Sequence, residues 1–364
     1  MMKRLCTSSA SAALALAVLA LGSARGDGVK VSAVGGAVML PDNQTLVVSL
    51  AADATLLYID TAGEKESKRV QVEFQPAALA AQGDKLFAAA KGTSTVHVCD
   101  AASGKELKIV KLPGEPILAL ACHPSKGLVY ASNQSCEVFS IDPEQGTATK
   151  TKAKGQMLAV DPVDGGFVYS GVQKPIRDVL VLQQAGAGQI TVSFAKADAR
   201  AVMLKSAVDD QDLKPTAAND NAALNGRWLA VSPDGKQVAM AGGGGWHSKT
   251  DAKFHYVVAV FDASDLQGMN GQVETGPYPA AVAFHPVLPL GVALASDLTV
   301  FSTKSFAKKE SFKPQKGGAA AYLGFGAKGT KVVYLPAGDD ALVQFFPLQL
   351  TDQDRETLNQ AFSK

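Results

Sequence analysis

The sequence contains few of the residues from which metal clusters and redox cofactor sites are built. Its 364 residues include only 5 His and 2 Trp. A copper cluster needs many imidazole ligands and a quinone-docking ring is rich in Trp, so these counts argue against both. The chain also lacks a Gly-x-Ser-x-Gly elbow, a P-loop and a His-Glu-x-x-His motif. No linear motif therefore assigns it to a class of catalyst.

The chain also lacks an excess of charge of either sign. Lys and Arg total 35 against 34 Asp and Glu, a formal net charge of +1. Nucleic acid and anionic membranes attract basic surfaces, so this balance gives no reason to expect either as a partner. The lysines that cluster near predicted outer strands are expected to keep those sheet edges soluble.

No apolar run is long enough to cross a membrane as a helix. The run near the N-terminus, Ala12–Leu21 (AALALAVLAL), is about half the 20 residues that a spanning helix needs. Two basic residues precede it and small residues follow it, which is typical of a secretory signal peptide. We expect residues 1–26 to be removed after Ala24 or Gly26 and the mature chain to be exported, periplasmic or extracellular. Retention of the segment as an anchor is the alternative.

Cysteine is scarce, and the expected mature chain keeps Cys99, Cys122 and Cys136. An odd number cannot close into disulfides, so at least one thiol is free or pairs between molecules. No two of them have the Cys-x-x-Cys spacing of a redox or zinc site. A chain of this length can bury a full core without disulfides.

A phrase of about forty residues repeats along the chain. Gly127–Gly146 (GLVYASNQSCEVFSIDPEQG) is a β-rich run, a polar connection, a second β-rich run and a turn closed by Gly. Thr45–Gly63 and Lys85–Gly104 have the same form. The aspartates that close the second run are Asp60, Asp100 and Asp142, spaced by 40 and 42 residues. A period of about 40–45 residues with four strands per repeat is typical of propeller blades.

We therefore predict an all-β chain that forms a seven-bladed β-propeller over residues 27–350, with four-stranded antiparallel blades. A wide gap between turn signals predicts an insertion at about residues 172–226, or an eighth blade as the alternative. A propeller leaves no long unpaired edges, so Val29–Val34 should close the last blade as its outer strand. Residues 351–364 predict a short helical tail, with Thr351 and Asp354 in a capping box.

The segment Val129–Gly146 (VYASNQSCEVFSIDPEQG) resembles the YVTN-type, WD40-like seven-bladed propellers of exported bacterial proteins. The resemblance extends over most of residues 29–350 and rests on the order of strand and turn segments in each repeat. That family includes binding modules, lactonase-like enzymes and relatives of quinone- or copper-dependent enzymes. The resemblance therefore implies the fold without choosing among these functions.

The stretch Gly242–Tyr256 (GGGGWHSKTDAKFHY) gathers the most unusual side chains of the sequence. We expect residues 242–255 to form the longest connection between the second and third strands of a blade, beside Val172–Asp178 of the preceding blade. Both connections should lie where the central channel opens. The candidate binding residues are Trp246, His247, Lys249, His255, Arg177 and Asp178. The alternative is a glycine-rich loop in which Trp246 and Phe254 serve only as hydrophobic anchors.

Other histidines and a metal site are weaker candidates. His247 and His255 are eight positions apart, and a divalent ion would need a further ligand such as Asp251. No cofactor is otherwise predicted. His123 and His285 each precede Pro in a predicted turn, where other repeats carry Asp or Ser, so we expect them to stabilise turns.

These patterns favour an exported, non-catalytic, monomeric propeller that recognises a partner protein or an envelope ligand at its channel-mouth face. The alternative is a metal-assisted hydrolase of lactonase-like type, acting on a small ester or lactone. Such an enzyme uses scattered carboxylates around the channel, which leave no linear signature.

Metal content distinguishes the two hypotheses. The binding hypothesis predicts purified protein with well under one equivalent of Ca²⁺ or Zn²⁺ by inductively coupled plasma mass spectrometry. One equivalent of either ion, together with chelator-sensitive lactone hydrolysis, would support the hydrolase instead.

Overall fold

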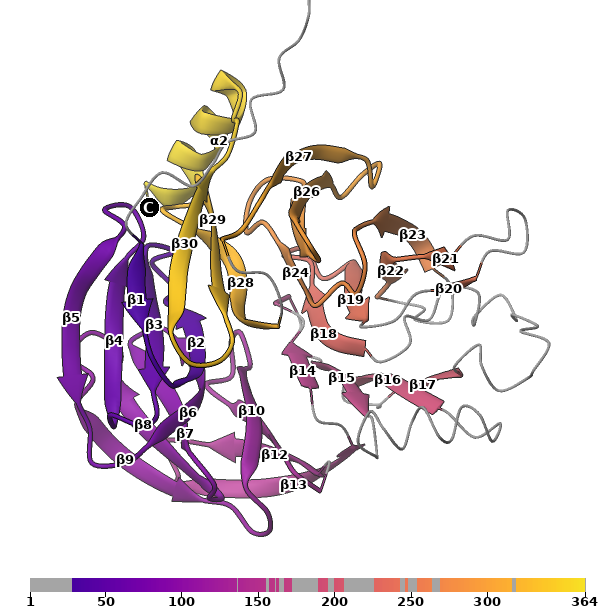
Figure 1. Cartoon of the computed structure of the whole chain (residues 1–364). Helices are drawn as coiled ribbons and strands as arrows, with labels where there is room; N and C mark the ends of the chain where they lie inside the picture. The colour runs from indigo at the N-terminus through magenta and orange to yellow at the C-terminus, as the bar shows by residue number, and fades with distance from the viewer. Residues whose placement is uncertain are drawn as a thin grey trace, which may run out of the picture.

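The computed structural model describes residues 28–135, 137–154, 157–160, 162–163, 167–171, 189–195, 200–205, 226–242, 246–247, 254–263, 269–315 and 319–363. These residues form four-stranded antiparallel sheets, one two-stranded hairpin and one C-terminal helix. The all-β prediction is therefore confirmed. Figure 1 shows the sheets grouped around a common centre, in a propeller-like arrangement.

The sheets follow one another along the chain, and each is named by its first and last strands. The first two contain β2 (Val34–Met39), β3 (Thr45–Leu50), β4 (Thr55–Asp60) and β5 (Lys65–Gln71), then β6 (Pro76–Gln82), β7 (Lys85–Ala90), β8 (Thr95–Asp100) and β9 (Glu106–Lys111). The next two contain β10 (Ile117–Cys122), β11 (Val129–Asn133), β12 (Glu137–Asp142) and β13 (Thr147–Lys154), then β14 (Met157–Val160), β15 (Phe167–Gly171), β16 (Gln189–Ala195) and β17 (Arg200–Lys205).

The later sheets repeat this order. They contain β18 (Gly226–Val231), β19 (Gln237–Gly242), β22 (Val257–Asp262) and β23 (Met269–Glu274), then β24 (Ala281–Phe284), β25 (Leu290–Leu294), β26 (Leu298–Ser302) and β27 (Lys308–Phe312). The closing sheet contains β28 (Ala320–Gly326), β29 (Lys331–Pro336), β30 (Ala341–Pro347) and, from the N-terminus, β1 (Val29–Val31).

The first strand of each sheet lies against the first strand of the next. These contacts run from β2 to β6, β10, β14, β18, β24 and β28, and return from β28 to β2. The backbones of neighbouring first strands approach closely. A Cβ atom added to Gly35 would lie 2.6 Å from the carbonyl oxygen of Pro76, so only glycine fits there. The ring of inner strands is therefore continuous.

The first strand of the chain closes the last sheet. Strand β1 pairs antiparallel with β30, with Val29 opposite Val343 and Val31 opposite Ala341. Figure 1 shows this junction where the indigo β1 lies beside the yellow β30. The predicted closing strand is confirmed for Val29–Val31, whereas Val34 begins β2. Closure hides a strand edge that would otherwise be open to pairing with other chains.

Polar groups join the first and last sheets where the ring closes. Thr61 is fully buried, and its Oγ1 accepts a hydrogen bond of 2.6 Å from the backbone N–H of Ala327. The Lys331 ammonium donates to the carbonyl oxygen of Ala62 at 3.0 Å and to the Glu64 carboxylate at 2.7 Å. The ammonium is mostly buried and would be costly to leave without these partners.

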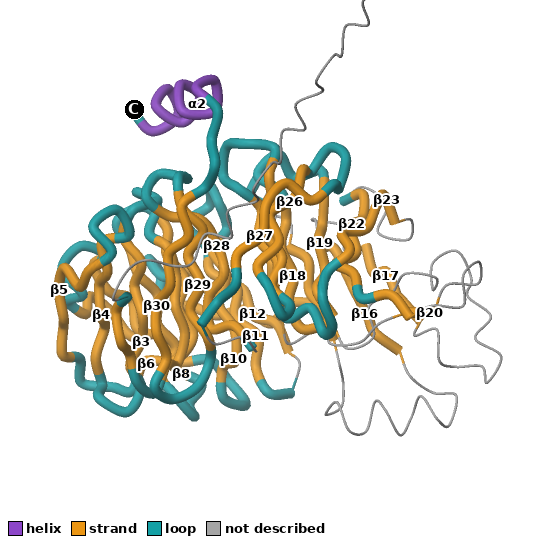
Figure 2. Tube along the Cα trace, turned by 45° about the horizontal axis from the view of Figure 1, so that its top comes forward, coloured by secondary structure: helices purple, strands orange, loops and turns teal. Residues whose placement is uncertain are grey.

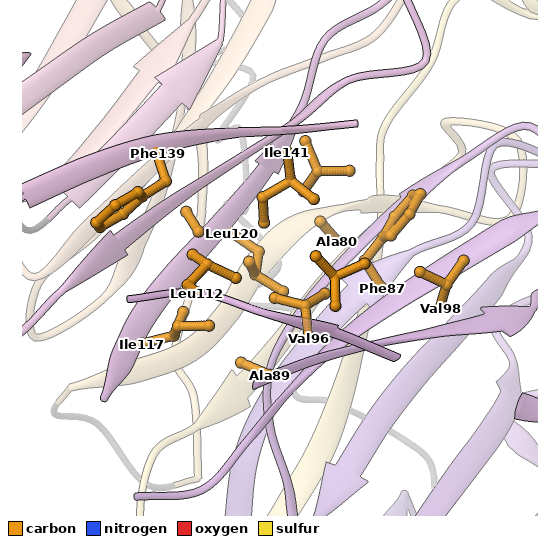
Figure 3. Close-up of a cluster of buried hydrophobic side chains, with 13 residues drawn as sticks. Ala80, Phe87, Ala89, Val96, Val98, Leu112, Ile117, Leu120, Phe139 and Ile141 are labelled. Carbon is orange, nitrogen blue, oxygen red and sulfur yellow. The ribbon is translucent and has the colours of Figure 1, made fainter. Parts of the chain in front are cut away.

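Apolar side chains fill the spaces between neighbouring sheets. One such cluster contains Phe87 and Val96 of the β6–β9 sheet together with Leu120, Phe139 and Ile141 of the β10–β13 sheet (Figure 3). Alternate residues of a strand point to opposite faces, so a strand buried on both faces is apolar throughout its length. This explains uninterrupted runs such as β3, in which Leu46, Val47 and Val48 are all fully buried.

A side chain on the fourth strand repeatedly reaches the backbone of the next sheet. Lys68 in β5 donates to the carbonyl oxygen of Ala102, and Lys108 in β9 donates to that of Glu144 at 2.5 Å. Lys68 and Lys108 occupy equivalent register positions, opposite Tyr58 and Val98. In β27, Glu310 takes the same position and accepts a bond of 3.3 Å from the N–H of Gln349. Lys68 and Lys108 thus join neighbouring sheets, a role additional to the protection of sheet edges that the sequence predicted.

The C-terminal tail forms helix α2 (Asp352–Phe362), which lies beyond one edge of the sheets in Figure 2. Thr351 and Asp354 form the predicted capping box. Leu358 is only 3% exposed, and its side chain lies beside Gly329 in the turn between β28 and β29. No helix in the described part of the chain is long and apolar enough to span a membrane.

The connection from the second to the third strand of the β14–β17 sheet is longer than predicted, within the predicted insertion at residues 172–226. The third strand is β16, so residues 172–188 join it to β15, in place of the predicted connection Val172–Asp178. This connection is longer than residues 243–256, which join β19 to β22, so the prediction that residues 242–255 form the longest one is wrong. The runs DVLVL (178–182) and QITVSFA (189–195) both have a strand-like pattern in the sequence. Pairing with β15 identifies the second run as the third strand, β16.

Replacing Lys331 tests the closure of the ring. Lys331→Ala should lower the free energy of unfolding by about 1–3 kcal/mol in urea titrations, because it leaves the Glu64 carboxylate and two backbone carbonyls without their donor. Lys309→Ala is the matched control, since Lys309 is exposed, and it should change stability by less than about 0.5 kcal/mol. Equal effects of the two variants would contradict a role for Lys331 in closure.

Candidate functional site

The direction of the strands sorts the connections onto two faces. Because neighbouring strands are antiparallel, connections from second to third strands share a face with the connections between sheets. Turns from first to second and from third to fourth strands lie on the opposite face, and Figure 2 shows loops gathered at two opposite edges. Helix α2 packs on the β28–β29 turn, so it belongs to that opposite face.

The predicted recognition loop contains a hairpin. Strands β20 (Trp246–His247) and β21 (Phe254–His255) pair antiparallel within the connection from β19 to β22. Trp246 is the ladder partner of His255, and His247 is the partner of Phe254. The structure thus brings Trp246, His247 and His255 onto one short ladder. The other predicted site residues, Lys249, Arg177, Asp178 and the weak metal ligand Asp251, lie outside the described residues.

Two tyrosines stand at the base of this hairpin. Tyr256 directly follows β21, and Tyr278 lies in the connection from β23 to β24. Their ring centroids are 5.3 Å apart, with an interplanar angle of 56°. Tilted pairs at this separation are favourable arrangements of aromatic rings. The Thr275 N–H also donates to the carbonyl oxygen of Tyr256 at 2.9 Å, which ties the two connections together. We call Tyr256, Tyr278 and the adjoining β20–β21 hairpin the tyrosine surface.

Tyr278 is held in a strained and exposed conformation. Its φ of 58° lies in the left-handed region, and its side chain is 61% exposed. It stands between Pro277 and Pro279, and a following proline disfavours helical backbone further. A left-handed non-glycine residue costs about 1–3 kcal/mol and persists only where its surroundings impose it. Such strain at an exposed aromatic residue is typical of binding sites.

The surroundings of Tyr278 explain how this conformation is maintained. A Cβ atom added to Gly276 would lie 2.3 Å from Ser296 Oγ, so the chain packs directly on the connection between β25 and β26. Desolvation, and then the hydroxyl of Tyr278, raise the pKa of Tyr256. The Tyr256 phenol is therefore protonated at neutral pH. The tyrosine surface combines aromatic area with polar hydroxyl groups.

His123 and His285 stabilise turns, as predicted. The Nδ1 of His285 accepts hydrogen bonds from the N–H groups of Val287 at 3.0 Å and Leu288 at 2.9 Å. The Nδ1 of His123 accepts the equivalent bonds from Ser125 and Lys126, both at 3.2 Å. In the first sheet Asp42, which follows Pro41 and so stands two positions later in the turn, accepts similar bonds from the N–H groups of Gln44 and Thr45.

The described histidine and cysteines of the β6–β9 and β10–β13 sheets are also packed. His97 stacks on Phe74 with a centroid distance of 3.5 Å, and its Nδ1 lies 2.5 Å from the Glu106 carboxylate. Burial raises the pKa of Cys99 and of Cys122 to about 12, so neither thiol is a nucleophile at neutral pH. Within the described ranges, no three His, Cys, Asp or Glu side chains form a metal-binding group.

The candidate residues predicted from the sequence end at His255, one residue before Tyr256. Tyr278 is not among them, although it lies within Gly276–Ala280 (GPYPA), where a tyrosine between two prolines indicates an unusual backbone. Their proximity arises only when two connections meet on one face. No protein-family model and no curated protein matches this chain.

The burial of His285 predicts a pH dependence of stability. Burial lowers the pKa of His285 from 6.5 to about 4, so the unfolded chain binds this proton at higher pH than the folded chain. The free energy of unfolding should fall by up to about 3 kcal/mol as pH decreases from 6.5 to 4. Chemical denaturation across this range measures the slope, and His285→Asn, which keeps an acceptor for the turn, should flatten it. An unchanged slope in that variant would assign the effect to other groups.

Proposed function

We propose that this chain is an exported, non-catalytic seven-bladed β-propeller that binds a partner protein or an envelope ligand through its tyrosine surface. The blades would be the four-stranded sheets, closed by β1. The continuous contacts of the inner strands and the β1–β30 pairing support this ring. The signal-like residues 1–26 and the resemblance to YVTN-type propellers support export.

The exposed, strained Tyr278 is the observation that carries the proposal. Folding alone gives no reason to hold an aromatic residue in the left-handed region while 61% of it faces solvent. Tyrosine concentrates binding energy at interfaces because its large ring loses little conformational entropy and its hydroxyl can donate or accept. Tyr256 supports the ring from the side, so the pair is preorganised before any partner arrives.

The composition of the adjoining hairpin supports the same function. Trp246 and His255 are ladder partners directly before Tyr256, so aromatic residues are concentrated in this part of the chain. Trp and Tyr are among the residues most enriched at energetically important positions of interfaces. The tyrosine pair beside this hairpin offers a partner a preorganised aromatic platform.

Tyr278→Gly separates binding from folding. Glycine adopts positive φ without strain, so this variant should be as stable as the parent or more stable by up to about 1 kcal/mol. It should nevertheless capture its envelope partner at least about 10-fold more weakly, because hot-spot residues contribute 2 kcal/mol or more. Affinity capture from envelope extract with quantitative mass spectrometry, followed by titration of the captured component, measures the difference.

Two further variants make the test specific. Leu107→Ser is the control, because Leu107 is 56% exposed but lies on β9, on an outer strand of another sheet. It should leave capture unchanged. Shortening residues 248–253 to a tight turn should weaken capture as Tyr278→Gly does. Retention of the same partner by both tyrosine-surface variants would refute the proposal.

A further inference from the structure

A cleft on the opposite face lies between the β18–β23 and β24–β27 sheets. Its volume is about 650 Å³, within the range of sites for small molecules. The turn at Ser232–Gln237 forms one side, and the turns at His285–Leu290 and Thr303–Phe306 form the other. Phe284 and Phe306 contribute aromatic surface, whereas Lys236 and Lys304 contribute positive charge.

The side chain that bridges sheets elsewhere is missing beside this cleft. Gly271 in β23 lies opposite Val260, immediately before the register shift of its sheet. This is the position that Lys68 occupies in β5 and Lys108 in β9, where each crosses to the next sheet. Gly271 has no side chain that could reach the next sheet. The neighbouring Asn270 is exposed and lines the cleft.

In the turn that faces Gly271, Phe306 occupies the position that glycine holds in two other sheets. Its N–H donates to the carbonyl oxygen of Ser302 at 2.8 Å, as Gly104 donates to Asp100 and Gly146 to Asp142 at the same distance. Gly104 and Gly146 have φ of 75° and 72°, and Phe306 is forced to 58°. The ring lies over Gly271, since a Cβ atom added there would be 2.2 Å from it. An aromatic residue in a strained position thus lines the cleft.

The charges around the cleft favour an anion. Asp234 accepts a hydrogen bond of 2.6 Å from Ser232 Oγ, which lowers the pKa of the carboxyl group and keeps it ionised. Lys236 lies 3.9 Å from Asp234 and largely offsets its charge. The Lys304 ammonium has no ion-pair partner among the described residues, so one positive charge remains. That charge stands beside apolar surface.

The remaining walls are rigid. His285 is buried, and both of its ring nitrogens are engaged, with Nε2 donating to the carbonyl oxygen of Gly329 at 2.9 Å. Gln237 Nε2 donates to the carbonyl oxygen of Thr303 at 3.2 Å, which ties the two sides of the cleft together. A preformed site loses little entropy when a ligand binds.

We propose that this cleft binds a small carboxylate with an apolar body, with the carboxylate at Lys304 and Lys236 and the apolar part on Phe284 and Phe306. This site is on the face opposite the tyrosine surface. The cleft adds a small-molecule function to the proposed partner-binding function.

Benzoate and benzamide test the charge requirement, because they share a ring and differ in charge. Transverse-relaxation-optimised NMR titrations should show benzoate shifting the backbone amides of Asn270, Lys304 and Phe306, and binding at least about 3-fold more tightly than benzamide. Lys304→Gln should weaken the binding of benzoate by about 2- to 5-fold and leave the binding of benzamide unchanged. Lys309→Gln, an exposed lysine outside the cleft, is the matched control and should change neither.

Phe306→Gly tests the apolar contact with a backbone that the turn accepts, since glycine holds the same turn position at Gly104 and Gly146, and a thermal melt checks that the variant is folded. This variant should weaken the binding of benzoate and of benzamide to the same extent. Equal affinities for the two probes, or shifts confined to residues outside the cleft, would overturn the proposal. Tyr278→Gly should leave benzoate binding intact, so failure of the cleft and failure of the tyrosine surface are distinguishable.

Discussion

The pairing of β1 with β30 is the interaction on which the rest of the structure depends. It joins the two ends of the chain in one sheet and removes the edge at which other chains could pair. Because these ends are far apart in the sequence, ordering them costs loop entropy, and the contacts between all neighbouring sheets must repay it. Thr61 of the first sheet and Lys331 of the closing sheet bond across the interface beside this junction.

The interfaces between sheets follow one plan with local exceptions. Apolar clusters fill the inner part, and a polar side chain of the fourth strand reaches the next backbone farther out. At the cleft, Gly271 stands in place of that side chain, and Phe306 lies over it. One repeat can vary in this way because the other interfaces keep the ring stable.

The two candidate sites share a physical signature. Tyr278 and Phe306 are both aromatic residues with left-handed backbone, at 58° each, and each lies in a connection between strands. Several smaller or polar residues, such as Ala54 and Glu64, also have positive φ, whereas the capping box of α2 and the glycines of the strand-linking turns follow local preference. Proteins tend to violate local rules at functional sites, where the surrounding scaffold offsets the cost. The two sites lie on opposite faces because antiparallel strands return each connection to a defined side.

The sequence by itself determined the all-β class, the four-strand repeat, the closing strand at Val29–Val31, the cap at Thr351 and the turn role of His123 and His285. These features follow from period-two alternation and turn chemistry, which act within a few residues. Tertiary structure decided which run became β16, which lysines cross between sheets, and that Tyr256 meets Tyr278. Those outcomes depend on register and on the meeting of distant connections, and neither leaves a local pattern because the contacting groups are separated in the chain.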